Sequence, residues 1–346
     1  MTKKDIRSLN IIELSALIET LGEKKFRATQ VYDWIHNKCV ESFDEMLNIP
    51  KSLKEKLLKD YTIYGLEIAR MQESKEDGTR KYLFKLHDGE YVESVYMKYQ
   101  HGNSVCVSSQ VGCRMGCSFC ASTLDGLVRN LEPGEILGQI YEIQKDTQSR
   151  VSNVVIMGSG EPFDNYDNVV KFMRLLSDER GLNISGRNIT VSTCGIVENI
   201  KRFADEELSA TLAISLHASN DEKRRKIMPI ANKYTIGEII EACKYFFDKT
   251  GRRLTFEYSL IAGVNDSEQE ADELSKLLHG LNCHVNLIPV NPVKETGYES
   301  PSKKAALAFK NKLEKNRINV TIRREMGRDI DGACGQLRRR VSNESK

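Results

Sequence analysis

The sequence predicts an α/β protein: a partial (βα)6 barrel that follows a small N-terminal helical accessory domain and a β-hairpin. From about residue 104 onward, apolar strand-like runs alternate with helical segments, a pattern typical of a parallel sheet with helices outside it. The first sixty residues show only helical spacing, and two strand-like runs flank Asp88-Gly89. Six strand–helix repeats favour an incomplete barrel, although periodicity alone does not separate a barrel from an open sheet.

The N-terminal domain is predicted at residues 1–75. Apolar residues recur at helical spacing between positions 11 and 21, ahead of Gly22, and again between positions 31 and 35. A third helix is expected after Pro50. Residues 76–100 then form the predicted hairpin, because Asp88-Gly89 between two alternating runs is a strong hairpin signal.

The core is predicted at residues 101–330, and a C-terminal tail at residues 331–346. Strands are expected near 104–109, 153–158, 188–193, 210–216, 254–261 and 283–289, with a further strand near 319–324. Helices are expected near 133–147, 166–178, 197–206, 235–249, 268–280 and 301–315. Pro133 and Ser300-Pro301 suit helix entry.

Composition limits the classes of function. The chain has 346 residues, 51 basic and 49 acidic, with a net charge of +2, so any RNA site has to be a local basic patch. We expect most basic clusters to be solvated faces. They are Lys24-Lys25-Arg27, Lys223-Arg224-Arg225-Lys226, Arg252-Arg253, Arg323-Arg324 and Arg338-Arg339-Arg340.

Compartment follows from hydropathy and cysteine usage. No apolar run approaches the roughly 18 residues of a membrane span, so we expect a cytoplasmic protein with no membrane partner. In that compartment, nine scattered cysteines argue against a disulfide framework and for metal or redox chemistry.

Three of these cysteines form the most informative motif. Cys113, Cys117 and Cys120 are separated by three residues and then two, so they can hold three corners of a four-iron cluster and leave the fourth iron open. This spacing resembles that of the radical S-adenosylmethionine (SAM) enzymes, in which the open iron binds SAM. A zinc site with Cys106 as fourth ligand, or chance, is the alternative.

Suitable polar groups follow the other predicted strands. Ligands in such folds sit beyond the carboxyl ends of the strands, where glycines permit close backbone approach and a carboxylate accepts from an ammonium group. Each group alone is weak evidence, but together they suit SAM. They are Gly158-Ser159-Gly160-Glu161-Pro162, Ser192, Ser215-Leu216-His217 and Asn291-Pro292.

Three further residues are candidates for chemistry. Glu93 shares a strand face with Val95 and Met97; if that face is buried, desolvation raises the pKa of the carboxyl group, and if it faces solvent Glu93 has no functional meaning. Cys334 lies between small residues, and Cys106 lies seven residues before the cluster motif. A thiolate can accept an alkyl group, and a second thiol can release it by forming a disulfide. The alternative is two inert buried cysteines.

Over most of its length the sequence resembles the RlmN family of radical SAM RNA adenine-C2 methyltransferases. One departure is Ser159, where the family has methionine; it leaves Gly160 and Glu161 intact. The matching segments include Ser42 to Met46, Val92-Glu93, Cys113 to Asn130, Gly160-Glu161-Pro162, Asn165 to Asn168, Ser215-Leu216-His217, Met228-Pro229 and Ala333 to Leu337.

The resemblance implies a role for each matching position. Cys113, Cys117 and Cys120 would hold the [4Fe–4S] cluster, and Cys334 would carry the methyl group. Cys106 would release the product through a transient disulfide, and either Glu93 or Cys106 would accept the carbon-2 proton. The implied SAM-binding residues are Gly160, Glu161, Ser192, Ser215, Leu216, His217 and Asn291.

The resemblance also implies two SAM molecules per turnover, one as methyl donor and one as radical source. The implied substrates are an adenosine of 23S rRNA near the peptidyl transferase centre and adenosine 37 of some tRNAs. An electron donor such as flavodoxin or ferredoxin would reduce the cluster, and the family suggests a monomer.

Two alternatives remain open. The related Cfr type methylates carbon 8 with the same cysteines; Gly160-Glu161-Pro162 followed by Asn165 to Asn168 favours carbon 2. A non-catalytic, zinc-stabilised RNA-binding module would instead bind zinc through Cys106 and the three motif cysteines.

Overall fold

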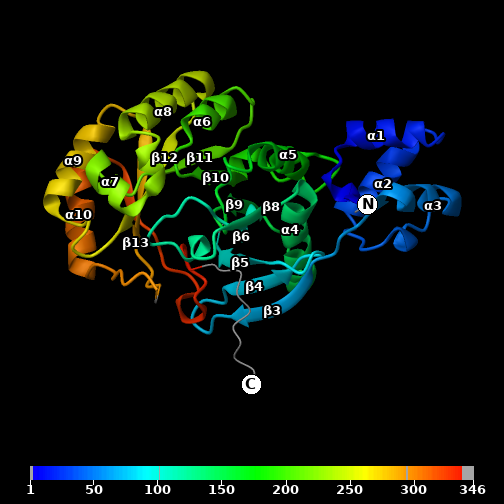
Figure 1. Ribbon diagram of the computed structural model, residues 1–346, viewed down its shortest axis with the longest axis horizontal. Helices are drawn as coiled ribbons and strands as arrows, with labels where there is room; N and C mark the ends of the chain where they lie inside the picture. The colour runs from blue at the N-terminus through cyan, green and yellow to red at the C-terminus, as the bar shows by residue number, and fades with distance from the viewer. Residues whose placement is uncertain (1–2, 101, 294, 337–346) are drawn as a thin grey trace.

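A ten-stranded mixed sheet forms the centre of the protein (Figure 1). The computed structural model describes residues 3–100, 102–293 and 295–336. The strands are β3 (Glu67–Glu73), β4 (Arg80–Lys85), β5 (Tyr91–Tyr99), β6 (Gly102–Val107), β9 (Asn153–Ile156), β10 (Ile189–Thr193), β11 (Thr211–Ser215), β12 (Leu254–Leu260), β13 (Cys283–Pro289) and β14 (Val320–Ile322).

The sheet order is β14-β13-β12-β11-β10-β9-β6-β5-β4-β3. Strands β6 and β9 to β14 are parallel, whereas β3, β4 and β5 add an antiparallel meander beside β6. Because β14 and β3 are the two edges, the sheet is not closed, which confirms the predicted partial barrel.

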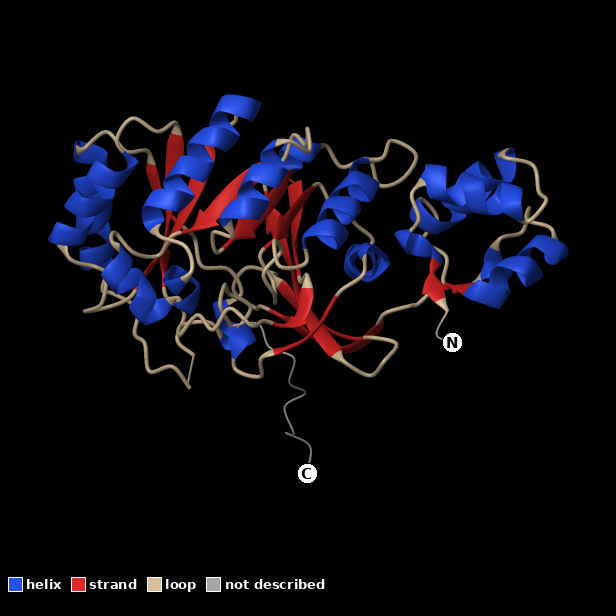
Figure 2. Cartoon of the chain, turned by 45° about the horizontal axis from the view of Figure 1, so that its top comes forward, coloured by secondary structure: helices blue, strands red, loops and turns tan. Residues whose placement is uncertain are grey.

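Helices cover the outer side of the parallel strands (Figure 2). Pro133 begins the first of them, as predicted, because its missing N–H costs nothing at the first helical position. Ser302, whose hydroxyl accepts from the Ala305 amide, starts the last helix two residues later than predicted. The helices are α4 (Pro133–Thr147), α5 (Tyr166–Ser177), α6 (Val197–Ala204), α7 (Asp221–Ile227), α8 (Ile236–Thr250), α9 (Glu268–Leu278) and α10 (Lys303–Lys315).

The three predicted N-terminal helices are present at one end of the molecule (Figure 1). They are α1 (Ile11–Thr20), α2 (Phe26–His36) and α3 (Lys51–Asp60), tied by the short parallel pair β1 (Lys4–Asp5) and β2 (Tyr61–Thr62). They contact α4, where the Ser8 hydroxyl accepts from the Gly134 amide. His36 hydrogen-bonds Tyr141 at the same interface.

Several elements were not expected from the sequence. Strand β3 falls within the range 1–75 assigned to the helical domain, and it pairs with β4 so that the predicted hairpin is part of a meander. Most residues of β3 are exposed at the sheet edge, so no alternation of apolar side chains marks it. The small hairpin of β7 (Gln110–Gly112) and β8 (Leu127–Asn130) was not predicted either. Nor was the short, highly charged α7.

The parallel strands expose one face toward the helices and the other toward the interior of the partial barrel. Along β10, Ile189, Val191 and Thr193 are buried, whereas Ser192 is half-buried on the opposite face, because successive side chains alternate across a strand. Within the described residues, no helix has the length and apolar character to cross a membrane.

Candidate active site

A cavity lies at the carboxyl ends of the parallel strands, with about 720 Å³ free of protein atoms. Part of that space is open to solvent. Side chains from the ends of six strands line it, so the strand-end residues predicted from the sequence converge. The predicted residues in the lining are Cys120, Gly160, Glu161, Ser192, Ser215, His217, Asn291 and Cys334.

Two glycines let the backbone after β9 pass close to its neighbours. A Cβ on Gly158 would lie 2.7 Å from the Ser108 hydroxyl oxygen. A Cβ on Gly160 would lie 2.7 Å from the Gln110 Cβ, and Gly160 also has φ +107°. Both distances are shorter than van der Waals contact, so only glycine fits this turn.

Glu161 is fixed in the cavity wall by backbone amides. Its Oε2 accepts from the Cys194 amide at 2.7 Å and its Oε1 accepts from the Phe163 amide at 3.0 Å. Burial raises the pKa of the carboxyl group, and these hydrogen bonds oppose that shift. Each oxygen keeps a further lone pair for a ligand cation.

His217 presents one ring nitrogen to the cavity. Its Nδ1 accepts from the Ser259 amide at 2.9 Å, and burial lowers the pKa of the imidazole to about 3. The ring is therefore neutral at physiological pH with its proton on Nε2, a donor for a ligand.

Leu216 contributes differently from its neighbours. Its side chain is fully buried in the core and does not line the cavity. Its backbone amide donates to the Glu257 carbonyl, and its carbonyl accepts from Arg224. Leu216 therefore shapes the cavity through its backbone.

The three motif cysteines lie on the loop after β7. Burial is the main cause that raises the pKa of each thiol, to about 12 for Cys113. Buried thiols of this kind stay protonated unless a metal supplies positive charge, so the donor set fits an iron–sulfur cluster. Among the described residues, no group of three or more His, Cys, Asp or Glu side chains is arranged to hold a single metal ion. A cluster does not need such a group, because each thiolate binds a different iron.

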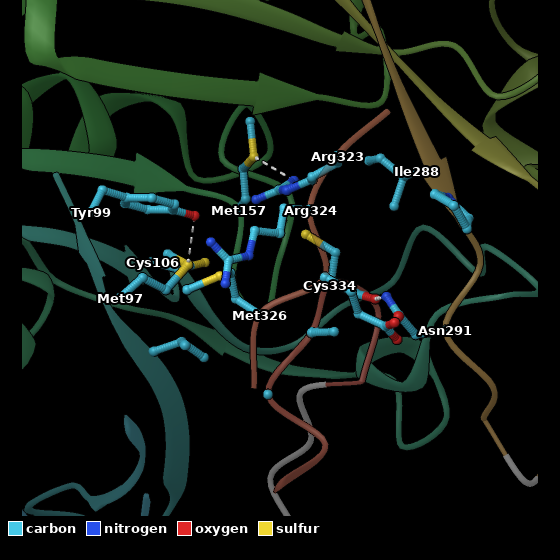
Figure 3. A pocket seen from close by; sticks show the side chains of 15 residues that line it. Met97, Tyr99, Cys106, Met157, Ile288, Asn291, Arg323, Arg324, Met326 and Cys334 are labelled. Carbon is cyan, nitrogen blue, oxygen red and sulfur yellow. Dashed lines mark hydrogen bonds between the residues drawn. The ribbon is translucent and has the colours of Figure 1, made fainter. Parts of the chain in front are cut away.

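A second cavity adjoins the first and contains the two cysteines predicted to take part in methyl transfer, Cys106 and Cys334 (Figure 3). Cys106 and Cys334 line it, and Cys334 lines the first cavity as well. Cys334 is positioned by its carbonyl, which accepts from the Asn291 amide group at 2.9 Å. Both are free thiols here. Burial, reinforced by Cys334, raises the pKa of Cys106 to about 12.

Cys106 is separated from the motif cysteines. It packs with Val95, Met97 and Met326, whereas Cys117 and Cys120 pack in another apolar cluster around Phe119. This arrangement argues against a zinc site that uses Cys106 as the fourth ligand.

Glu93 is buried, which is the condition that the sequence analysis set for a functional role of its carboxyl group. Its carboxylate lies 3.6 Å from the Lys81 ammonium group, which donates to the Asp331 carbonyl. Glu93 is outside the set of residues that line either cavity, but it shares its strand face with Val95 and Met97 of the second.

Sequence reasoning missed Glu257, Ser259 and Arg323, which line the first cavity. Arg323 also lines the second cavity, and it lies 3.9 Å from Glu257. A signal was available for Ser259 and Arg323, which lie near the ends of predicted strands, whereas Glu257 lies in the middle of β12. Arg323 belongs to the pair Arg323-Arg324, which the sequence presents as one of several basic clusters that could contact RNA. Residues 337–346 of the predicted tail lie outside the described residues.

The partial barrel, the three-cysteine loop and the strand-end cavity define a radical SAM enzyme. The family model for the radical SAM superfamily matches residues 107–274, and the model for a ribosomal RNA large subunit methyltransferase N-terminal domain matches residues 4–63.

Full-length relatives specify the family. The chain is 65% identical over 340 residues to the probable dual-specificity RNA methyltransferase RlmN of Lachnospira eligens, covering 98% of this chain and 97% of that protein. It is 55% identical to the protein of the same name from Clostridioides difficile, covering 98% and 99%. A radical SAM methyltransferase from Sphaerobacter thermophilus, solved by crystallography, superposes with a TM-score of 0.93 at 41% identity, covering 97% and 100%. The chain belongs to the RlmN family, whose cofactors are a [4Fe–4S] cluster and SAM.

Proposed function

We propose that this protein methylates carbon 2 of adenine in RNA, with 23S rRNA and some tRNAs as substrates. One observation carries the proposal: Cys334 lines both the strand-end cavity and the adjoining cavity that contains Cys106. A thiol in that position can receive a group on one side and deliver it on the other. Membership of the RlmN family supports the choice of RNA and of carbon 2.

Cys113, Cys117 and Cys120 would hold the cluster at the mouth of the strand-end cavity. The SAM-binding residues would be Gly160, Glu161, Ser192, Ser215, Leu216, His217 and Asn291. When bound, the cluster and SAM supply a methyl donor and a means of removing a hydrogen atom. Glu161 would accept from the SAM ammonium group, and His217 would donate from Nε2.

Cys334 would be the carrier that this chemistry needs. Carbon 2 of adenine is electron-poor and cannot attack an electrophilic methyl group. The Cys334 thiolate would accept the methyl group instead, and after loss of a hydrogen atom that carbon would bond to carbon 2. The adduct would then lose the carbon-2 proton and one electron, which the cluster would accept. The Cys106 thiolate would then bond to the sulfur of Cys334, and the electron pair of the carbon–sulfur bond would pass to the carbon, which takes up a proton and becomes the methyl group of the freed base. A thiol reductant would reduce the resulting disulfide before the next turnover. Glu93, beside Lys81, would receive the carbon-2 proton.

The division of labour along the chain follows from these roles. The N-terminal helices and the meander would recognise folded RNA, which proteins read mainly through shape and unpaired bases. Residues 101–330 would perform the chemistry, and the tail from residue 331 would place Cys334. A flavodoxin or ferredoxin would supply electrons to a monomeric, cytoplasmic enzyme.

The first test is the mass of the peptide that contains Cys334. Protein expressed with its cluster should carry one methyl group on Cys334, and C113A, which removes a cluster ligand, should not. RNA from cells with and without the gene should differ by 2-methyladenosine. An 8-methyladenosine product would indicate Cfr-type chemistry, and stoichiometric zinc without iron would indicate the RNA-binding module.

A further inference from the structure

Helix α7 contains a basic run, Lys223-Arg224-Arg225-Lys226, in which one residue does not face solvent. The other three behave as expected: Lys223 pairs with Glu270, Lys226 pairs with Glu222, and Arg225 is exposed. Arg224 is the exception, because it is fully buried and is among the largest buried side chains of the protein.

The Arg224 guanidinium group ties together two strand ends beside the SAM-binding residues. Nε donates to the Leu216 carbonyl at 3.1 Å. Nη2 donates to the Cys194 carbonyl at 2.6 Å and to the Ser215 carbonyl at 3.3 Å. These carbonyls are at the ends of β10 and β11, so one side chain sets the distance between them.

Within the described residues, Arg224 has one nitrogen without a hydrogen bond and no ion-pair partner. Nη1 has no hydrogen-bond partner, and no Asp or Glu of the described chain forms an ion pair with the group. A buried cation without an anion is costly, because removal from water disfavours the charged form. Burial accordingly lowers the pKa of Arg224. Such an arrangement indicates that a negative charge belongs nearby.

Cys194, whose carbonyl accepts from Arg224, packs in the same apolar cluster as Cys117 of the cluster loop. The thiolate forms of Cys194 and Cys117, followed by the Asp221 carboxylate, would interact favourably with the charge of Arg224. The C-terminus of α7 holds this loop, since the Ser118 amide donates to the Ile227 carbonyl at 2.9 Å. A Cβ on Gly116 would lie 3.2 Å from Pro229, which follows α7.

We propose that Arg224 is a positioning residue for the iron–sulfur cluster: it fixes the ends of β10 and β11 behind the cluster loop and supplies the positive charge that balances the cluster held through Cys117. This inference rests on the cluster ligands proposed above. A fixed cation near the cluster stabilises its reduced, more negative form more than its oxidised form. The cluster should therefore be harder to reduce without Arg224.

The test compares R224Q, which keeps hydrogen-bond donors but loses the charge, with R224K, which keeps the charge but loses the planar fork. R225Q, on the exposed side of the same helix, is the matched control. In anaerobically purified protein without RNA, the midpoint potential of the cluster is measured by EPR. We expect the reduced-to-oxidised ratio of R224Q at fixed potential to fall at least about tenfold, a shift of ~59 mV for a one-electron couple. R224K should stay closer to the wild type, and R225Q should match it.

A wild-type potential in R224Q overturns the inference. So does an equal shift in R224Q and R224K, because the charge would then not be the cause. If R224Q folds by circular dichroism but retains no iron while R224K retains it, the charge is needed to hold the cluster, which supports the inference. Should R224Q fail to fold, R224M, which also lacks the charge, is compared with R224K in the same measurement. Wild-type protein that contains zinc and no iron would refute the proposed function itself, so the two failures are distinguishable.

Discussion

At the scale of single residues, Cys106 and Cys334 differ in what surrounds them. Cys106, on β6, is buried against Val95, Met97 and Met326, whereas Cys334 is half-buried between two cavities. The more accessible thiol suits the carrier, and the buried thiol suits a group that acts only on an adduct already formed beside it.

Replacing Cys106 with alanine should block release of the product. Methylation of Cys334 and addition to RNA need no second thiol, so C106A should accumulate a covalent protein–RNA adduct, and the yield of free methylated RNA should fall by at least about tenfold. Denaturing gel electrophoresis with labelled RNA measures the adduct.

The matched control is C243A, which removes another fully buried thiol on α8 that lines neither cavity. Each substitution leaves a small void, costing about 1 kcal/mol of folding free energy. Normal yields of free methylated RNA from C106A would remove Cys106 from the mechanism.

The sequence predicted most lining residues because one rule locates them: parallel strands bring their carboxyl ends together. The rule places Gly160, Ser192 and His217 correctly, but it does not say which way a side chain points. Leu216 therefore acts through its backbone instead of lining the cavity. Arg224 was misjudged because a charged run gives no hint that one member is buried.

At the scale of elements, the contact between α2 and α4 depends on a neutral histidine. His36 Nδ1 lies 2.7 Å from the Tyr141 hydroxyl oxygen, and burial, reinforced by Arg7, lowers the pKa of His36 to about 3. In the unfolded chain the pKa is near ~6.5. Between these values the unfolded state binds a proton that the folded state does not, so acid favours unfolding.

We therefore expect stability to fall as the pH drops from about 6.5 toward 3, with His36 contributing ~1.4 kcal/mol per pH unit over much of that range. H36Q should show a shallower dependence of the free energy of unfolding on pH. His217 shifts in the same direction, so part of the slope should remain. Urea unfolding at pH 7, 6 and 5 measures it.

His279, exposed after α9, provides the control. H279Q should keep the wild-type slope. An H36Q slope equal to that of the wild type would show that the α2–α4 contact does not sense acid, and the protonation would have to occur elsewhere.

Helices and strands were predictable where their apolar side chains recur with a clear period. The six core strands and their helices show alternation or helical spacing, and most bounds differ from the prediction by one or two residues. Strand β3 has no such pattern because an exposed edge strand need not bury one face. Helix α7 was missed because it has only seven residues, four of them basic.

At the scale of the whole molecule, chemistry and the predicted RNA recognition occupy different regions. The first cavity is lined by residues at the ends of the parallel strands. Helices α1 to α3 lie at one end of the molecule and α10 lies toward the other (Figure 1). Lys24 and Lys25 are exposed ahead of α2, beside the half-exposed ring of Phe26, and Arg27 lies 4.9 Å from that ring. Basic groups around an exposed aromatic ring suit a contact with RNA.

Reversing two charges at this end should separate RNA binding from methyl loading. K24E/K25E should lower the affinity for RNA about tenfold at low salt and reduce the salt dependence of binding, because fewer phosphate contacts release fewer counterions. In the proposed mechanism, methylation of Cys334 needs SAM and the cluster but no RNA, so it should proceed at the wild-type level. Filter binding across a salt series and the mass of the Cys334 peptide measure the two effects.

K303E/K304E is the matched pair, since it reverses two adjacent exposed lysines at the start of α10. It changes the net charge by the same amount, so any loss due to bulk charge alone would appear equally in both variants. Equal losses would therefore refute a recognition role for the N-terminal helices. A loss confined to K24E/K25E, with Cys334 fully methylated, would mean that the protein brings RNA to a carrier already loaded at the strand ends.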